Sequence, residues 1–254
     1  LKEQEQIIRY LDLNLGQINI LIADSKNAIQ KINDDKQLFL NKMFSFSHED
    51  NFLSVCNILK LIECGLVQAG TTPNRSIRAY YGSEYPLFKP SDFRHKMQLK
   101  YAESYLTAKG LKVAGYVSAN SLLICTSGIN LGNVRITKVD CACSQQMISI
   151  TLRDSLIPEF VYFQMNTDVF KEHLYNSSKN SIVNISAFKN LSLWAPGLDL
   201  QQSIVNELRA EINLLVKKES KIRRKLISLE VTKCNFLLRA FPANLLVKDD
   251  VADR

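Results

Sequence analysis

The sequence has few of the residues that form metal and catalytic centres. Its three histidines lie far apart, at positions 48, 95 and 173, and its six cysteines include no C-x-x-C pair. A zinc site is therefore not expected, and reduced, partly buried thiols of a cytoplasmic protein are the better interpretation of the cysteines. The G-x-x-x-x-G-K-[ST] phosphate loop, the G-x-S-x-G nucleophile elbow and the Asn/Asp-Pro-Pro-aromatic loop of methyltransferases are also missing. We therefore expect no catalytic residue, no metal and no cofactor in this chain.

Long apolar runs are missing as well. No run of about 18 apolar residues occurs, so no transmembrane helix is expected, and the first residues lack the pattern of a secretory signal peptide. The hydrophobic fraction of 46% among 254 residues is nevertheless sufficient for a globular core. Residue 1 is Leu rather than Met and already lies in a helical pattern. We therefore expect the chain to be a fragment of a longer protein.

Positive charge is concentrated in two clusters, within a net charge of +7. Residues 71–112 contain eight Lys or Arg against three Asp or Glu, and residues 217–225 contain six positive charges and one negative charge. Residues 1–47 are balanced, with six charges of each sign. Basic clusters favour a polyanionic partner. The 217–225 cluster is also typical of a solvated helix face.

The two ends of the chain repeat each other without a gap at a separation of 197 residues. The identities are Leu1, Gln4, Ile7, Leu11, Lys36, Phe39, Leu40 and Phe44, which match Leu198, Gln201, Ile204, Leu208, Lys233, Phe236, Leu237 and Phe241. Both copies also carry a heptad pattern, with positions a and d running from Ile8 to Met43 and from Val205 to Ala240. Such a narrow apolar stripe requires a partner helix.

We therefore expect two long helices, 1–46 and 198–243, that pair with each other as an antiparallel coiled coil, followed by a flexible tail at 244–254. A helix of about 45 residues would be about 65 Å long. Asp199 is the predicted N-cap of the second helix, with Gln202 at the capping-box spacing, and Pro242 would end it. Lys36 and Lys233 occupy matched a positions. They either fix the register or extend their stems at a frayed end.

Residues 47–197 predict a globular domain of mixed helices and strands. We expect a strand and turn at 58–68, an ordered loop at 80–93, and strands at 121–128, 133–139 and 147–152. One amphipathic helix is expected over 158–175 with Pro158 in its first turn, followed by a short helix at 186–191 and a strand at 191–196. The fold class is therefore α+β: a mixed α/β globular domain flanked by two long helices.

Basic side chains interleaved with aromatic residues make this domain a candidate for binding nucleic acid. Lys89, Arg94, Lys96 and Lys100 are the candidates for phosphate contacts, and Thr72, Ser91, Asn130, Gln145 and Gln146 are the candidates for base edges. The full DNA-binding set adds Thr71, Arg75, Lys179 and Asn180. For each polar residue beside a turn, a structural role in that turn is the alternative.

Six segments, in this order, resemble the specificity subunit of type I restriction–modification enzymes. They are GTTP (70–73), YYGSEYPLFKPSDF (80–93), LLICTSGINLGNV (122–134), SQQMISI (144–150), PEFVYFQM (158–165) and NISAFKNLSLWAPGLDLQQSIV (184–205). None is specific alone, but their order and spacing between the repeats are, and the resemblance covers nearly the whole chain. One difference is Gly-Leu-Asp at 197–199, where the family often has a Pro-Pro-Leu-Glu type run; it affects only the local turn.

The resemblance implies a central spacer helix, a second target-recognition domain and a terminal spacer helix. It implies a non-catalytic, cytoplasmic subunit that reads one half of a two-part target in double-stranded DNA. Its partners would be methylation subunits, which use S-adenosylmethionine, and a motor–nuclease subunit. A natural half-length subunit would form a homodimer. Two alternatives are the recognition part of a fused restriction–methylation enzyme and a non-catalytic coiled-coil assembly protein.

Overall fold

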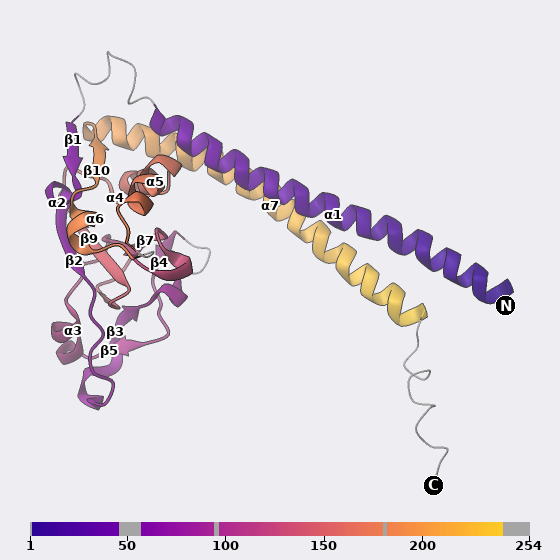
Figure 1. Cartoon of the computed structure of the whole chain (residues 1–254), viewed down its shortest axis with the longest axis horizontal. Helices are drawn as coiled ribbons and strands as arrows, with labels where there is room; N and C mark the ends of the chain where they lie inside the picture. Colours follow the sequence, from indigo (N-terminus) through magenta and orange to yellow (C-terminus); the bar gives the residue numbers. More distant parts are fainter. Residues whose placement is uncertain (1, 46–56, 94–96, 180–181, 241–254) are drawn as a thin grey trace, which may run out of the picture. The chain divides into compact units, whose positions relative to one another are not determined.

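The computed structural model describes residues 2–45, 57–93, 97–179 and 182–240 (Figure 1). The chain divides into two compact units, one formed by residues 1–38 with 210–254 and the other by residues 39–209. We call them the helical unit and the globular unit. Among the described residues, none of the helices has both the length and the hydrophobicity needed to span a bilayer. The tail expected at 244–254 lies outside the described residues.

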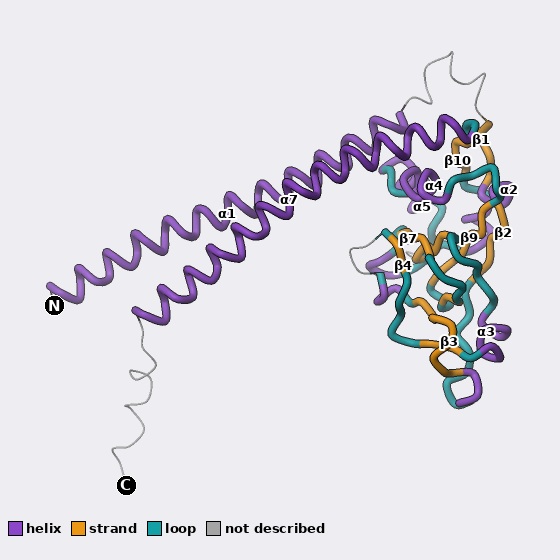
Figure 2. The backbone as a smooth tube through the Cα atoms, turned by 180° about the vertical axis from the view of Figure 1, so that it is seen from behind, coloured by secondary structure: helices purple, strands orange, loops and turns teal. Residues whose placement is uncertain are grey.

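The helical unit is built from the two long helices that the heptads predict. α1 spans Lys2–Phe44 and α7 spans Leu198–Ala240, and within this unit they lie side by side in opposite directions (Figures 1 and 2). The ring of Tyr10, near the start of α1, lies 6.0 Å from that of Phe236, near the end of α7. Lys36, late in α1, bonds to Glu219, earlier in α7. The predicted antiparallel coiled coil is confirmed.

Predicted a and d residues in the middle of the two helices face the seam of this coiled coil. Ile29, Ile32 and Leu215 are buried, whereas their neighbours on the outer faces are exposed. Ser25, a polar d residue, is buried too, and its hydroxyl donates to the Leu21 carbonyl at 2.7 Å. Burial of the stripe supplies the main stabilisation of such long helices, because a single helix of low hydrophobicity is only marginally stable in water.

The predicted start of the second helix is wrong in detail. α7 begins at Leu198, so Asp199 lies inside the first turn and does not cap it. The Gly197 carbonyl accepts a hydrogen bond from the N–H of Leu200 at 3.1 Å instead, and the Gln202 side chain bonds one turn further along the helix. Asp199 still suits this position, because a carboxylate in the first turn interacts favourably with the helix dipole.

Among the residues that the structure describes, three sheets form the framework of the globular unit. The largest has the strand order β2-β9-β6-β7-β4, and all of its neighbours are antiparallel except β4 and β7. Its strands are β2 (Gly65–Ala69), β9 (Met147–Leu152), β6 (Leu122–Cys125), β7 (Val134–Thr137) and β4 (Gln98–Leu99). A second sheet has the order β5-β3-β8, from β5 (Tyr105–Leu106), β3 (Tyr81–Phe88) and β8 (Ala142–Cys143), and β1 (Asn57–Lys60) pairs with β10 (Ser192–Ala195).

Short helices connect and cover these strands (Figures 1 and 2). They are α2 (Leu61–Cys64), α3 (Ala108–Ala114), α4 (Pro158–Met165), α5 (Asp168–Asn176) and α6 (Ile185–Lys189). The expected strands at 121–128, 133–139, 147–152 and 191–196 are confirmed as β6, β7, β9 and β10, and the short helix near 186–191 is confirmed as α6. The strand and turn at 58–68 are two strands joined by the single helical turn α2.

Two element predictions are wrong. The ordered loop at 80–93 contains the eight-residue strand β3. Its proline, Pro86, pairs with Tyr105 of β5, and the register shift of this strand lies before it, between Tyr81 and Tyr85. The single helix at 158–175 is two helices, α4 and α5. It breaks because the Thr167 side chain accepts a hydrogen bond from the Phe170 N–H at 3.3 Å and so starts a new helix.

Buried cysteines form part of the core. Cys125, Cys141 and Cys143 pack with Phe88, Leu123 and Met147 between the large sheet and its neighbour. Burial raises the pKa of the Cys125 thiol to about 12, so it stays protonated and packs as a small apolar group.

A buried carboxylate, that of Glu159 on α4, is paired with Arg209 on α7. The pairing offsets the cost of burying a lone charge.

Candidate nucleic-acid interface

Three of the predicted turns meet at one end of the large sheet. The register pairs Ala69, the last residue of β2, with Ile148, and pairs Cys125, the last residue of β6, with Met147. The chain therefore leaves β2 and β6, and enters β9, at the same edge. We call residues 70–73, 126–133, 144–146, 179 and 182–183 the turn cluster.

Backbone hydrogen bonds tie these segments together. The Thr71 N–H donates to the Cys143 carbonyl at 3.0 Å, the Thr126 N–H to the Gln146 carbonyl at 2.9 Å, and the Val183 N–H to the Thr126 carbonyl at 2.9 Å. Gly70 makes the closest approach, since a Cβ there would lie 2.2 Å from the Ser144 carbonyl oxygen. Only glycine fits at this crossing. These contacts hold the backbone of the turn cluster in a fixed arrangement.

The turn cluster carries most of the predicted base-contacting residues. Thr71, Gln145 and Gln146 are exposed, and Thr72 is partly exposed. Asn130 is partly exposed, and its Oδ1 accepts a hydrogen bond from the Asn133 side chain at 3.2 Å, so at least part of its role is to shape the turn. Lys179 is exposed at the edge of the cluster, and Asn180 lies outside the described residues.

The predicted phosphate contacts begin beside the same turns. The Ser144 N–H donates to the Phe88 carbonyl at 2.9 Å, so Lys89, the next residue, starts next to the 144–146 turn. Asp92, which is buried, holds this loop by accepting from the Lys89 N–H at 2.7 Å and from the Glu103 N–H at 3.0 Å. Ser91 is exposed on the loop, whereas Arg94 and Lys96 lie outside the described residues.

An open hollow gathers positive charge from three points of the chain. It is lined by Arg75, Arg78, Tyr81, Lys89 and Ser104. The Lys89 ammonium donates to the Ser104 hydroxyl at 2.7 Å, which holds it in the lining. Arg78 was counted in the basic region but not selected as a contact; it lies in the 3-10 turn Arg78–Tyr80 and lines this hollow together with Arg75. The cations of this hollow are suited to binding phosphate oxygens.

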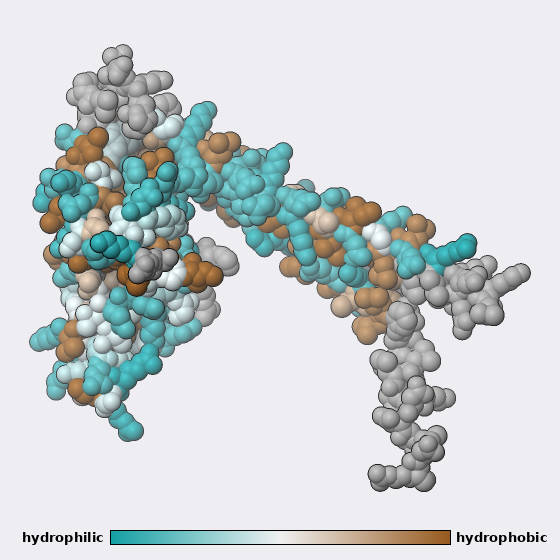
Figure 3. Space-filling view, in the orientation of Figure 1, coloured by the Kyte–Doolittle hydropathy of each residue, from teal (hydrophilic) through white to brown (hydrophobic). Residues whose placement is uncertain are grey.

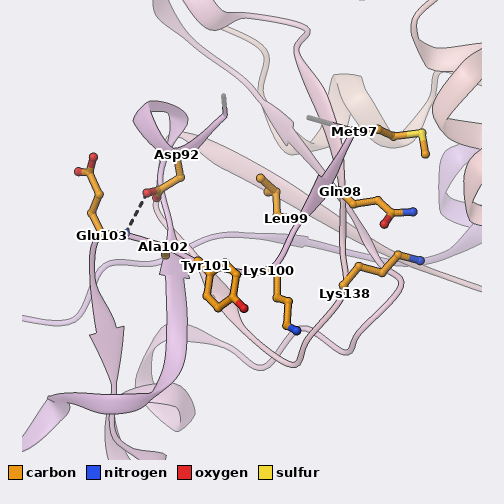
Figure 4. A pocket seen from close by; sticks show the side chains of 9 residues that line it. All are labelled: Asp92, Met97, Gln98, Leu99, Lys100, Tyr101, Ala102, Glu103 and Lys138. Atoms are coloured by element: carbon orange, nitrogen blue, oxygen red, sulfur yellow. Dashed lines mark hydrogen bonds between the residues drawn. The ribbon is translucent and has the colours of Figure 1, made fainter. Parts of the chain in front are cut away.

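A second hollow, of about 750 Å³, places another two lysines together (Figure 4). Lys100 follows β4, and Lys138 follows the adjacent parallel strand β7. The Lys138 N–H donates to the Leu99 carbonyl at 2.8 Å, which holds the ends of the two strands together. The Lys100 ammonium lies 5.5 Å from the centre of the exposed Tyr101 ring. Lys138 was not predicted, because its partner is 38 positions away in the sequence and only strand pairing brings them together.

These surfaces offer hydrogen bonds and charge. Within the part of the chain that the structure describes, no group of three or more His, Cys, Asp or Glu side chains converges as metal ligands would. The first hollow supplies cations, and the second combines Lys100 and Lys138 with the carboxylates of Asp92 and Glu103. The turn cluster supplies amide and hydroxyl groups. This combination is suited to a nucleic acid, because cations can contact its phosphates while amide and hydroxyl groups contact the edges of its bases.

Comparison with known proteins identifies the family. Residues 56–226 match the family model described as "Type I restriction modification DNA specificity domain". The type I restriction enzyme MjaIX specificity subunit of Methanocaldococcus jannaschii is 26% identical over 207 residues, which cover 78% of this chain and 48% of that protein. The HindI specificity subunit of Haemophilus influenzae is 24% identical over 147 residues, covering 55% of this chain and 32% of that protein.

Solved structures share the fold. A chain in the structure reported as "Structural basis underlying complex assembly and conformational transition of the type I R-M system" has a TM-score of 0.77 and 16% identity. The match covers 95% of this chain and 60% of that one. The HsdS subunit from Thermoanaerobacter tengcongensis has a TM-score of 0.60 and 17% identity, with 96% and 59% covered.

The chain spans about half the length, or less, of the curated relatives that it matches. The family match nevertheless covers more than half of the chain, including the whole region of the turn cluster and of both hollows. The chain therefore belongs to the type I restriction–modification DNA specificity family.

Proposed function

We propose that this chain is a non-catalytic part of a type I specificity subunit that reads one half of a bipartite target in double-stranded DNA. The observation that carries the proposal is the turn cluster, which presents Thr71, Gln145 and Gln146 beside the first hollow, whose lining includes Arg75, Arg78 and Lys89. Amide side chains can pair with adenine in two hydrogen bonds, and hydroxyls can pair with several base edges. Cations nearby hold the phosphates and so fix the position of the reading side chains.

The division of roles follows from the geometry. In the first hollow, Arg75, Arg78 and Lys89 would bind phosphate oxygens, and in the second Lys100 and Lys138 would do so. Arg94, Lys96, Lys179 and Asn180 remain proposals on the same basis of charge and polarity. Contacts to phosphates carry no sequence information, whereas those of the turn cluster do.

The outer faces of the helical unit support a second role, the docking of methylation subunits. Ile227, Val231 and Leu238 recur along α7 outside the a and d positions, and all three are exposed. On α1, Leu13 and Ile20 are also exposed and lie outside the a and d positions. Figure 3 shows hydrophobic residues at the surface of this unit. A second apolar stripe on a paired helix favours packing against further helices.

The rest of the assembly supplies the chemistry in this proposal. Methylation subunits would bind S-adenosylmethionine and transfer its methyl group, a motor–nuclease subunit would cut, and the complex would work in the cytoplasm. The coiled coil would act as a spacer between two recognition domains, which meet major-groove segments about 34 Å apart. In a half-length subunit, a second copy of the chain would supply the second domain.

The experiment that tests this proposal expresses the chain with its methylation subunits and maps the modified adenines of the host genome. We expect a two-part target, and we expect Gln145→Ala together with Gln146→Ala to change or relax only one of the two parts. Gln202→Ala, an exposed glutamine on α7, is the matched control and should leave the target unchanged. An unaltered target in the double variant would reject the turn cluster as the reading surface. Methylation by the chain alone would instead favour a fused enzyme.

A further inference from the structure

The tip of the turn cluster exposes one apolar side chain completely. Ile129 lies in the 3-10 turn Gly128–Asn130 between β6 and β7, and its exposed fraction is 101%, the highest among the described large apolar side chains. Single exposed apolar residues are common on protein surfaces. Ile129 differs from them in its position, because its turn belongs to the turn cluster, the surface that we propose faces DNA.

The turn that carries Ile129 is held in place by its backbone. Gly128 and Gly132 have φ values of 71° and 80°, which suit glycine and would strain most other residues. The Gly132 N–H donates to the Cys125 carbonyl at 2.9 Å, and the Tyr175 hydroxyl donates to the Leu131 carbonyl at 3.3 Å. Little conformational freedom therefore remains to be lost when the tip binds.

The neighbours of Ile129 suit a nucleic acid rather than an apolar protein surface. Asn130 follows it directly, and the preceding strand end is bonded to Gln146 through the Thr126 N–H. A second exposed isoleucine, Ile182, is placed beside the turn by a bridge to Ser127. Lys179 pairs with Ile182 through a second bridge, so a cation also lies next to this turn. An apolar tip among amide groups and beside a cation resembles the arrangement by which proteins insert a wedge between base pairs while binding the backbone.

We infer that Ile129 is a wedge that inserts between two adjacent base pairs of the half-site and partly unstacks them. This inference rests on the proposed function and adds to it a way of reading DNA. Unstacking costs least at flexible pyrimidine–purine steps, so the wedge would select such a step without a hydrogen bond to either base. Ile182, beside it, would cover the sugar edge of the opened step.

The test uses the complex of this chain with its methylation subunits, on duplexes that carry the mapped target. The adenine analogue 2-aminopurine, which fluoresces more strongly when unstacked, is placed at successive positions of the half-site. The adenine to be methylated is left out, because methylation subunits would flip it out of the stack. We expect wild-type protein to raise the fluorescence at one step. Ile129→Ala should abolish that rise and weaken binding to the target by roughly tenfold or more, with little change in binding to unrelated DNA.

Two further variants keep the result interpretable. Ile129→Leu retains an apolar tip and should preserve the fluorescence rise. Ile58→Ala makes the same chemical change at an exposed isoleucine on β1 and should behave as wild type. If wild-type complex binds the target without a rise at any position, the wedge is wrong and the proposed function stands. If replacement of thymine by uracil reproduces the loss seen with Ile129→Ala and no rise occurs, Ile129 contacts a thymine methyl group instead. If the complex does not prefer the target at all, both proposals fail.

Discussion

The Lys36 ammonium lies 2.5 Å from a carboxylate oxygen of Glu219, across the seam of the coiled coil. Both residues occupy heptad a positions, where apolar side chains are usual. Glu219 also accepts a hydrogen bond from Arg223, one turn along α7, at 2.6 Å. An ion pair at one level of an apolar seam specifies which residues face each other, because any shift of register would place a charge against apolar side chains. The pair therefore favours register setting by Lys36 over a stem that extends from a frayed end.

Acid should weaken this pair. The hydrogen bond from Lys36 lowers the pKa of Glu219 below its ordinary value; burial opposes this shift, and Arg223 adds to it. The pair therefore contributes fully to the free energy of unfolding above the ordinary pKa of 4.5, and the contribution is lost as the pH falls through the lower folded-state pKa. Thermal unfolding followed by circular dichroism at 222 nm should show that Glu219→Gln is less sensitive to acid in this range than wild type. Glu230→Gln, an exposed change on α7, should keep the wild-type sensitivity.

Replacing the pair with apolar residues should stabilise the helices and loosen their register. Lys36→Leu combined with Glu219→Leu extends the apolar seam and removes the cost of partly dehydrating two charges, so we expect the free energy of unfolding to rise by about 1 kcal/mol or more. Urea unfolding measures that change. Cysteine cross-linking between the helices should then trap more than one register. A single register in the double variant would show that other contacts set it.

Gln201 should be one of the most sensitive residues of the globular unit. Its buried side chain donates to the Ser155 and Pro196 carbonyls, at 2.9 and 2.7 Å, and accepts from the Ile157 N–H at 2.8 Å. Gln201→Leu leaves these three backbone groups without that partner, and we expect a loss of about 3 kcal/mol in urea unfolding. Gln202→Leu, an exposed change at the next position, should cost less than about 0.5 kcal/mol. Equal effects of the two variants would contradict the assignment.

Arg78 should contribute to DNA binding without regard to sequence. Arg78→Ala removes one cation from the hollow that also contains Arg75 and Lys89, so affinity should fall about equally on all duplexes, and the slope of log affinity against log salt should decrease by roughly one. Fluorescence anisotropy at several salt concentrations measures both. Arg153→Ala, an exposed arginine that follows β9 at the opposite end of the large sheet, is the control. A loss confined to one DNA sequence would indicate base reading instead.

Lys96→Ala carries the same expectation from sequence alone, since Lys96 lies outside the described residues. It should weaken binding on all duplexes and lower the salt slope by roughly one. The same anisotropy titration applies, and insensitivity both to this change and to salt would remove the 94–96 segment from the interface.

Local patterns predicted the elements that depend on local physics. The heptads predicted both long helices and their pairing, because an apolar stripe on a helix must be covered along its length. The alternation and the apolar content of residues 121–152 predicted β6, β7 and β9. β3 was missed because Pro86 and Gly82 argue against a strand in isolation, whereas in the folded protein Pro86 pairs with Tyr105 of β5. The break at Thr167 was missed because a threonine can also lie inside a helix. In the folded protein its hydroxyl accepts a hydrogen bond from the Phe170 N–H and so caps a new helix.

The sequence by itself determined which side chains could bind DNA, how the ends of the chain pair, and the family resemblance, since these follow from composition, period and order. Only the tertiary structure decided which side chains act together. Antiparallel pairing of β2, β6 and β9 gathers the turn at 70–73 with turns more than 50 residues later, and the parallel pairing of β4 with β7 brings Lys138 to Lys100. A surface of this kind depends on strand register, and register is set by long-range packing that no short segment encodes.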